Sequence, residues 1–402
     1  MADRILADEP DGGVPAPHRR GSGSSRRARL RMQGLAQQAL AIAALAAILG
    51  YFGFNIARNL EASGLTGGFG FLWQEAGFAM SFSLIPMSEE ATYGRVYVAG
   101  TLNTLFIASL ALVLATILGL LIGLARVAPA RPMRLIAVSY IETLRNVPLL
   151  LILIFTQTVV LRSLPVVRDA LNLGGGFYIS NRGIYLPAPV GGPDLAIAAS
   201  VAALGLCAFL VAVILRPREP IRSWGDVRTS FAGTAVGAAA LLFAVTLVEW
   251  DRPVLTGFNY SGGITLMPEF VALLVALVLY NAAFIAEIVR AGIDNVDKGQ
   301  IEAARALGLP LGFIHRRIVL PQALRLMVPP VTNQYIHLIK ASSLATVVGF
   351  PDLVAVFLGT SLNQTGRAVE IVILTAAVYL TISLAVGAAS AMYNRRVQLV
   401  ER

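Results

Sequence analysis

Eight stretches of the chain are apolar enough and long enough to cross a bilayer as α-helices. Each holds about 20 mainly apolar residues, the length that satisfies every backbone N–H and C=O across roughly 30 Å of hydrocarbon. The expected spans are 36–57, 98–125, 135–161, 195–215, 231–249, 268–289, 326–349 and 369–392. Prolines and polar side chains between Pro329 and Lys340 interrupt the seventh. The pattern therefore predicts an all-α integral membrane protein with about eight transmembrane helices.

Basic residues are distributed unevenly among the connections between these spans, and their distribution predicts the orientation of the chain. With the N-terminus inside, 23 Lys and Arg side chains fall on the cytoplasmic side and seven fall outside. Such an excess marks the cytoplasmic face. We expect a multi-pass protein of the bacterial inner membrane with both termini in the cytoplasm. The net charge of +9 then reflects topology and attraction to anionic lipid, so the expected partner is the bilayer and not a nucleic acid.

The spans divide the chain into unequal parts. Residues 1–33 are rich in Pro, Gly, Ser and Arg, and we expect a disordered, basic cytoplasmic tail. Residues 34–96 hold the first span and an external segment whose aromatic side chains suggest a re-entrant or interfacial helix. Residues 97–392 form the main transmembrane domain, and 393–402 form a short cytoplasmic tail.

Composition excludes several kinds of chemistry. The chain is 56% hydrophobic and 14% charged, whereas an ordinary soluble domain carries about a quarter charged residues. One cysteine, Cys207, permits no intrachain disulfide, and the three histidines are too scattered for an H-E-x-x-H metal pair. Neither lysine follows a glycine, as the phosphate-binding G-x-x-x-x-G-K-[ST] loop requires. We expect no catalytic residue, no metal site and no cofactor bound by this chain.

A short helix is predicted between the sixth and seventh spans. Residues 300–307 are good helix formers, with Asp297 as the N-cap and Gly308 as a left-handed stop. Two alanine residues give this helix small side chains, so that a partner can approach it closely. Glu302 offers a hydrogen-bond acceptor. Such a helix suits docking into a groove of a cytoplasmic partner.

The same segment resembles the pattern E-A-A, three residues, G, nine residues, I-x-L-P of binding-protein-dependent ABC-importer permeases, which have the type I importer fold. The matching residues are Glu302, Ala303, Ala304, Gly308, Ile318, Leu320 and Pro321. The resemblance implies a coupling helix that docks on an ATP-hydrolysing subunit, so that ATP and magnesium are used by a partner chain. The alternative is an ordinary amphipathic loop helix.

Four further segments resemble the polar amino-acid permeases, the branch that serves histidine, glutamine, glutamate and general L-amino acids. They are 100–105, 140–150, 286–292 and 333–343. The chain departs from the smaller members by an insertion at about 164–255 with two extra spans, and its size resembles the larger subunit of a permease pair. The resemblance implies three kinds of partner: a second homologous permease, an ATP-binding subunit dimer and a periplasmic amino-acid-binding protein.

Charged and small polar side chains fall at membrane depth. Glu142 and Arg145 share a helix face in the third span, where an unpaired charge costs at least ~2.5–3.5 kcal/mol, so we expect a mutual ion pair. Glu287 and Arg290 repeat this spacing at the inner end of the sixth span. These pairs either lock helix packing or take part in the conformational switch.

Other polar residues are candidates for the translocation path. They are Asn103, Thr104, Asn281, Asn333 and Lys340. For the small polar groups the alternative is a packing hydrogen bond between helices. For Lys340 the alternative is a buried structural pair.

Two functions from different classes are consistent with these patterns. The leading hypothesis is a permease subunit of an ATP-driven, binding-protein-dependent importer that moves L-amino acids by alternating access. The alternative is a stand-alone membrane carrier or membrane enzyme. It would need a catalytic cluster or carboxylates at mid-depth, whereas Glu142 is the only acidic residue well inside a predicted span.

Overall fold

The computed structural model describes residues 23–62, 68–191 and 246–397, together with a few single positions between 197 and 243. Most of the predicted spans 195–215 and 231–249 therefore lies outside the described residues, as do residues 1–22 and 398–402. The chain divides into two compact units, Met1–Gly68 and Phe69–Arg402.

The first unit contains one long helix, α1 (Gly23–Ala62). It includes the apolar stretch Met32–Asn55, which is long enough to cross a membrane and corresponds to the first predicted span. Because α1 begins at Gly23, the last part of the segment 1–33 is helical and not disordered. Arg, Leu, Met and Gln side chains in this part favour a helix, which continues directly into the apolar run.

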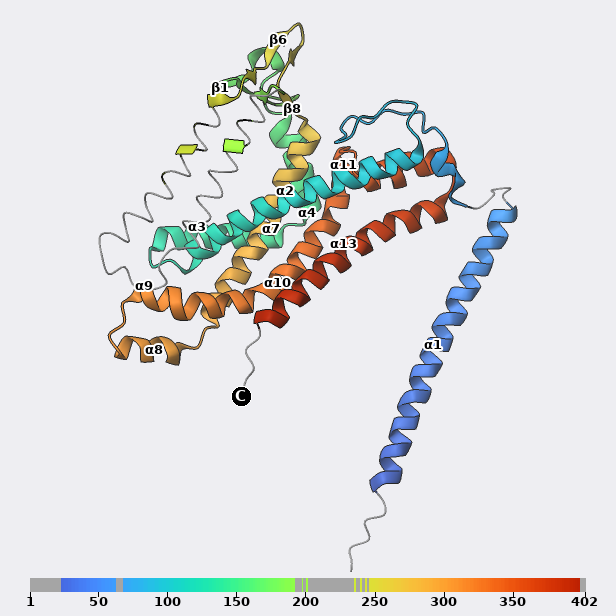
Figure 1. The fold of residues 1–402 in the computed structure, drawn as a ribbon, viewed down its shortest axis with the longest axis vertical. Helices are drawn as coiled ribbons and strands as arrows, with labels where there is room; N and C mark the ends of the chain where they lie inside the picture. The colour runs from blue at the N-terminus through green and yellow to red at the C-terminus, as the bar shows by residue number, and fades with distance from the viewer. Residues whose placement is uncertain are drawn as a thin grey trace, which may run out of the picture. The chain divides into compact units, whose positions relative to one another are not determined.

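The second unit is a bundle of helices arranged around α7 (Figure 1). Its long helices are α2 (Tyr93–Val127), α3 (Arg131–Asn146), α7 (Pro268–Asp294), α10 (Leu320–Ala341) and α13 (Ala368–Val397). Helices α2, α3 and α10 pack against α7, and α13 packs against α10. Buried side chains such as Ile107, Leu273 and Ile285 form the core between them.

Close approach of two backbones fixes the central helix pair, α2 and α7. A Cβ atom added at Gly119 would lie 2.7 Å from Ile285 Cβ, and one added at Gly123 would lie 2.7 Å from Val289 Cβ. Small residues spaced four apart let membrane helices approach closely, because packing and not hydrophobic transfer drives their association in lipid. The glycine pair therefore sets the α2–α7 separation.

The third predicted span, 135–161, is broken rather than straight. Helix α3 ends at Asn146, Pro148 caps α4 (Leu149–Phe155), and a π-helical segment, η2 (Thr156–Leu161), follows. The two parts are bent by 102°. Pro148 explains the break, because proline disfavours helical geometry in the residue before it.

The seventh predicted span, 326–349, also differs from the structure. Helix α10 begins at Leu320, runs through Pro329 and Pro330, and ends at Ala341. Short pieces follow it: η5 (Ser342–Leu344), α11 (Ala345–Val348), the π-helical η6 (Val354–Ser361) and α12 (Leu362–Thr365). Gly349 and Gly366, both with left-handed φ, end two of these pieces. This broken segment joins α10 to α13.

The described residues contain four helices that are long and apolar enough to cross a membrane, or five if the bent pair counts as one span. Helical membrane architecture is thus confirmed. The total of about eight spans stays a prediction.

The expectation of an all-α chain is wrong for residues 171–189 and 250–266, which fall mostly inside the predicted insertion and form short antiparallel strands (Figure 1). The strands are β1 (Leu171–Gly174), β2 (Phe177–Ser180), β3 (Gly183–Leu186), β4 (Ala188–Pro189), β5 (Trp250–Asp251), β6 (Val254–Thr256), β7 (Asn259–Ser261) and β8 (Ile264–Leu266). Strand pairing gives a sheet β1-β2-β3-β8 and two pairs, β4-β5 and β6-β7. Glycine-rich turns with aromatic and β-branched neighbours favour such hairpins.

These strands bring together two segments that are far apart in the chain, residues 183–190 and 249–266. Strand β3 pairs with β8, and β4 pairs with β5. The Val190 N–H also donates to the Glu249 C=O at 2.8 Å. The chain therefore leaves and re-enters this β region at neighbouring points.

The external segment expected to hold a helix contains only one short helix in its described part, the 3-10 turn η1 (Phe69–Trp73). Phe71 is fully buried there and contacts Tyr93 and Phe357. A second 3-10 turn, η3 (Val167–Asp169), precedes β1.

Candidate coupling site

The predicted short helix is present as α8 (Lys298–Ala306), which begins two residues and ends one residue earlier than the predicted 300–307 and keeps the predicted N-cap at Asp297. The Asp297 side chain accepts a hydrogen bond from the Gly299 N–H at 2.8 Å, which is an N-cap interaction. Gly308 has a φ of +72°, and its N–H donates to the Arg305 C=O at 2.9 Å. Only glycine adopts this left-handed conformation without strain, so its position explains where the helix stops.

One face of α8 is buried and the opposite face is exposed. Ala304 is 4% exposed and packs in the core with Ile314 and Val319, which belong to α9 (Leu311–Ile314) and the π-helical η4 (His315–Val319). By contrast, Glu302 and Ala303 are exposed, and Leu307 is 79% exposed. The exposed leucine offers an apolar side chain for a helix-in-groove contact.

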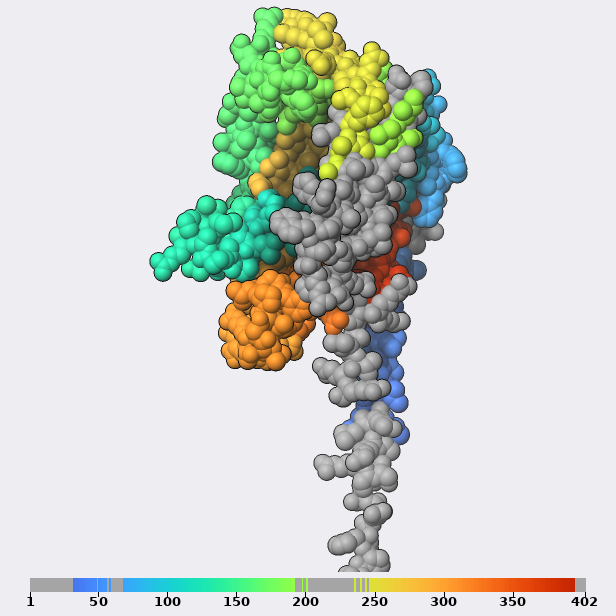
Figure 2. Space-filling model, turned by 60° about the vertical axis from the view of Figure 1, so that its left-hand side comes forward, coloured from blue at the N-terminus to red at the C-terminus, as the bar shows by residue number. Residues whose placement is uncertain are grey.

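The other predicted coupling residues lie in η4 and at the start of α10. Ile318 is half-buried against the core, whereas Leu320 and Pro321 are exposed at the start of α10. Gln322 donates a 2.6 Å hydrogen bond to the Gln300 side chain and so links α10 to α8. In the space-filling view this segment, coloured orange, projects at the end of the unit opposite the β strands (Figure 2).

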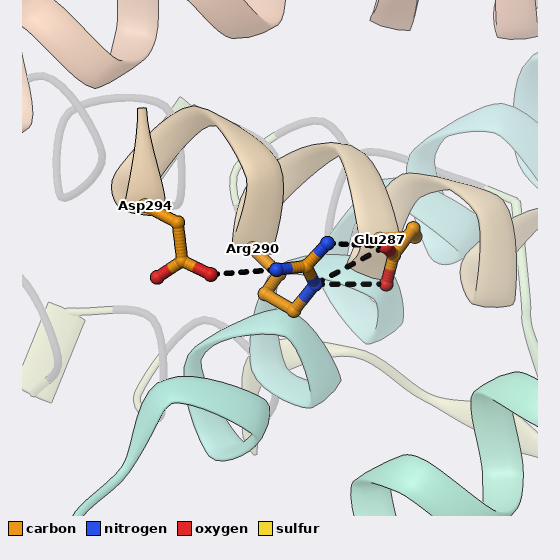
Figure 3. A network of polar contacts seen from close by, with 3 residues as sticks. All are labelled: Glu287, Arg290 and Asp294. Carbon is orange, nitrogen blue, oxygen red and sulfur yellow. Dashed lines mark hydrogen bonds and ion pairs between the residues drawn. The ribbon is translucent and has the colours of Figure 1, made fainter. Parts of the chain in front are cut away.

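Glu287 and Arg290 make the contact that their spacing predicts. Arg290 Nη2 lies 2.6 Å from Glu287 Oε1, and Arg290 Nη1 lies 2.6 Å from Asp294 Oδ2 (Figure 3). Asp294 was missed from sequence, although its i,i+4 spacing to Arg290 was a signal. The guanidinium group is thus held between two carboxylates at the end of α7 nearest α8.

The expected ion pair between Glu142 and Arg145 is wrong. Both side chains are exposed, and no ion pair joins them among the described residues. The guanidinium carbon of Arg145 lies instead 5.3 Å from the centre of the Phe284 ring, a cation–π contact with α7. The contact with α7 is the physical reason, because it holds the guanidinium group over the Phe284 ring and beyond ion-pair distance of the Glu142 carboxylate.

Asn103 and Thr104 are fully buried and make packing contacts. Asn103 Nδ2 donates to the C=O groups of Phe82 at 3.0 Å and Pro351 at 2.8 Å. Thr104 Oγ1 accepts from the Leu353 N–H at 3.0 Å. Both residues therefore hold the segment before η6 against α2, which favours the packing alternative over a path.

The remaining path candidates differ among themselves. Asn281 is fully buried and accepts a 2.7 Å hydrogen bond from the Gln334 side chain, which joins α7 to α10. Asn333 and Lys340 are exposed on α10. Of these candidates, only Asn333 and Lys340 have side chains that are exposed enough to contact a solute.

Comparison with known proteins decides the family. The family described as "Binding-protein-dependent transport system inner membrane component" matches residues 228–399, a range that includes α8. The putative amino-acid ABC transporter permease YhdX of Escherichia coli is 43% identical over 371 residues, covering 91% of this chain and 94% of that protein. The chain belongs to the amino-acid ABC transporter permeases.

Another permease is nearly as similar. The general L-amino acid transport system permease AapQ of Rhizobium johnstonii is 39% identical over 369 residues, covering 91% of this chain and 92% of that protein. A solved amino acid ABC transporter chain, determined with histidines, is 24% identical with a TM-score of 0.46, covering 76% of this chain and 95% of that chain.

Membership of the amino-acid ABC transporter permeases establishes the class of function. This permease is a membrane-embedded transport subunit and not a stand-alone carrier or a membrane enzyme. Hydrolysis of ATP belongs to a separate subunit, and the family works with an ATPase and a binding protein in the inner membrane.

Proposed function

We propose that this permease is the larger member of a pair of unequal permeases in an ATP-driven importer of L-amino acids. The similarity to a general L-amino acid transport permease over 91% of the chain supports this substrate class. The proposed complex contains a second homologous permease, an ATP-binding subunit dimer and a periplasmic amino-acid-binding protein. ATP and magnesium are bound by the ATPase dimer, and this chain binds no cofactor.

The orientation proposed for this complex has both termini and α8 in the cytoplasm. The basis is the excess of basic residues, 23 against seven, in the connections on that side. The β strands then lie on the periplasmic side, because they occupy the end of the unit opposite α8 (Figure 1).

The observation that carries the coupling role is the surface of α8. The helix is fixed at both ends by Asp297 and Gly308 while Glu302 and Leu307 stay exposed. Leu307 supplies an apolar anchor, and Glu302 accepts hydrogen bonds from the groove of the ATPase. A short rigid helix with one anchor transmits a displacement better than a loose loop does.

Packing suggests how a displacement of α8 reaches the membrane. Ala304 contacts the cluster of Ile314 and Val319, which continues through Ala323 and Met327 of α10 to α7. When ATP closes the ATPase dimer, α8 moves with its groove and carries α10 and α7 with it. These helices reorient between outward-open and inward-open states, which is alternating access.

Variants of α8 test the coupling proposal. Glu302→Lys and Leu307→Asp should abolish co-purification of the ATPase subunit with a tagged permease while its abundance in the membrane stays normal. Glu89→Lys, an exposed charge reversal in the segment before α2, is the matched control and should keep the ATPase bound. Normal ATPase recovery with both α8 variants would refute the docking role of this helix.

A further inference from the structure

A pocket of about 480 Å³ lies where the last turns of α2 and α7 meet α9, η4 and the first turn of α10. Its volume falls in the range of about 300–1,000 Å³ that is typical of small-molecule sites. Leu124 and Leu320 contribute apolar walls, and Asp294, His315 and Arg316 contribute polar groups. The pocket therefore combines apolar and charged surface at the end of the bundle nearest α8.

Arg316 supplies a positive charge that no acidic side chain balances directly. Its side chain is exposed, and none of the ion pairs found in the described ranges includes it. The carboxylate of the same pocket is already engaged, because Asp294 Oδ2 lies 2.6 Å from Arg290 Nη1 (Figure 3). His315 Nδ1 donates to the Leu311 C=O at 2.9 Å, so Nε2 is the ring atom left for a ligand. The guanidinium group of Arg316 is therefore available to a ligand.

The charged groups around the pocket favour an anionic ligand. Ion pairs and electrostatic interactions join the pocket's carboxylate to further charges at the ends of α2, α3 and α7. Together with the pocket's own charges, these groups comprise four arginines and two carboxylates: Arg126, Arg145, Arg290, Arg316, Glu287 and Asp294. The positive excess attracts an anion, and a guanidinium group is suited to phosphate because it can donate two parallel hydrogen bonds to it.

An apolar strip leads away from the pocket along the membrane-spanning part of α2. Ile117, Leu121 and Leu124 are 53%, 61% and 51% exposed, and their spacing of four and three residues places them on one helix face. Leu320 and Leu324 are exposed at the same spacing on α10. Because Leu124 and Leu320 also line the pocket, a ligand whose charged group occupies it finds apolar surface for long chains beside it.

We propose that this pocket binds the headgroup of an anionic phospholipid of the cytoplasmic leaflet. Arg316 contacts the phosphate, and the acyl chains lie along Leu121, Leu124 and Leu324. Basic pockets between membrane helices on the cytoplasmic side suit such headgroups. The assignment rests on the proposed orientation, in which α8 and the neighbouring ends of α2 and α7 face the cytoplasm.

The position of the pocket gives the bound lipid a role in coupling. Segment η4 follows α8 and α9 in the chain and leads directly into α10. A lipid held by Arg316 of η4 and by the apolar surface of α2 connects this segment to the membrane-spanning helices. It therefore steadies the connection through which a displacement of α8 reaches the bundle.

Binding of soluble short-chain lipids tests the site in the complete complex of both permeases and the ATPase dimer, purified in a neutral detergent. Dioctanoyl phosphatidylglycerol should raise the unfolding temperature, because a ligand that binds the folded state stabilises it. Dioctanoyl phosphatidylcholine and inorganic phosphate at the same concentrations should not. Equal stabilisation by phosphatidylcholine would indicate a site for acyl chains alone, and equal stabilisation by inorganic phosphate a site for free phosphate. Either result, or no stabilisation by phosphatidylglycerol, would overturn the proposal.

Matched substitutions locate the site. Arg316→Gln should raise the apparent dissociation constant for phosphatidylglycerol at least about tenfold, the loss expected for a hydrogen bond to a charged group. Arg317→Gln removes another exposed charge of η4 that does not line the pocket, so it should bind as the wild type does. Unchanged affinity in Arg316→Gln, or an equal loss in Arg317→Gln, would overturn the assignment. Release of the ATPase by Arg316→Gln with unchanged lipid affinity would make the pocket a protein contact instead.

Uptake measures the consequence for coupling. Proteoliposomes are made from phosphatidylcholine alone or from an equal mixture of phosphatidylcholine and phosphatidylglycerol. ATP-dependent amino-acid uptake by the wild-type complex and by Arg317→Gln should be faster in the mixture, and Arg316→Gln should lose this difference. A full response of Arg316→Gln to phosphatidylglycerol would overturn the proposal. Absence of ATP-dependent uptake by the wild-type complex in both kinds of vesicle would overturn the importer function instead, because the lipid affinities are measured without transport.

Discussion

Replacement of Gly308 gives a graded test of how α8 is held. A Cβ atom at this position would meet no heavy atom within 4 Å, so a substitution adds no clash. The cost comes only from the backbone, since φ is +72°. For a residue with a Cβ, the left-handed conformation costs roughly 1–2 kcal/mol, and the cost is larger for β-branched residues than for Asn. The expected order of damage is Val, then Ala, then Asn.

The strain energy at position 308 determines what fraction of the molecules holds α8 in its docking conformation. About 1–2 kcal/mol shifts an equilibrium by a factor of roughly 5–30. If α8 relieves strain by leaving its docking conformation, Gly308→Ala lowers the apparent affinity for the ATPase subunit by that factor, because affinity scales with the competent fraction. Gly308→Asn should fall closer to the wild type.

The assay is titration of purified ATPase subunit onto the permease pair in nanodiscs, read as stimulated ATP hydrolysis. Gly312→Ala is the matched control, because this helical glycine in α9 also has no atom within 4 Å of an added Cβ but has no positive φ. It should leave the affinity unchanged. Equal affinities for Gly308→Val and the wild type, or an equal loss in Gly312→Ala, would refute the reasoning.

Other predictions concern packing, the insertion and orientation. Gly123→Ala should lower the thermal unfolding midpoint, because overpacking at the α2–α7 contact costs about 1–3 kcal/mol; Gly387→Ala, where an added Cβ meets nothing within 4 Å, should not. Replacing residues 192–245 with a short Gly-Ser linker should leave a chain that inserts and binds the ATPase, because β4 pairs with β5 on either side of the cut; failure to insert would make this segment part of the core. A cysteine that replaces Pro310 should be labelled only from the cytoplasm, and one that replaces Phe258 only from the periplasm. The reverse pattern would contradict the orientation.

Local signals in the sequence predicted the elements that depend on few residues. Four apolar runs became long helices, and the N-cap at Asp297 and the left-handed stop at Gly308 are present. The contact between Glu287 and Arg290 also follows from spacing on one helix. Each of these features depends on residues that are close together in the sequence, so a single sequence reveals it.

Features that depend on tertiary contacts were not predictable in the same way. Arg145 lies over the ring of Phe284 on α7, a partner far away in the chain, and makes no ion pair with Glu142 on its own helix. Short strands such as β3 and β8 were missed because their pairing joins segments that are far apart in the chain.

ATP-dependent uptake by the purified complex tests the central claim most directly. The permease pair and the ATPase dimer are reconstituted in proteoliposomes with ATP and magnesium on the side of α8 and the binding protein loaded with a labelled L-amino acid on the other. Accumulation should require ATP, the binding protein and this chain, and Glu302→Lys should abolish it. Uptake that continues without the ATPase, or that is unaffected when this chain is omitted, would contradict the account.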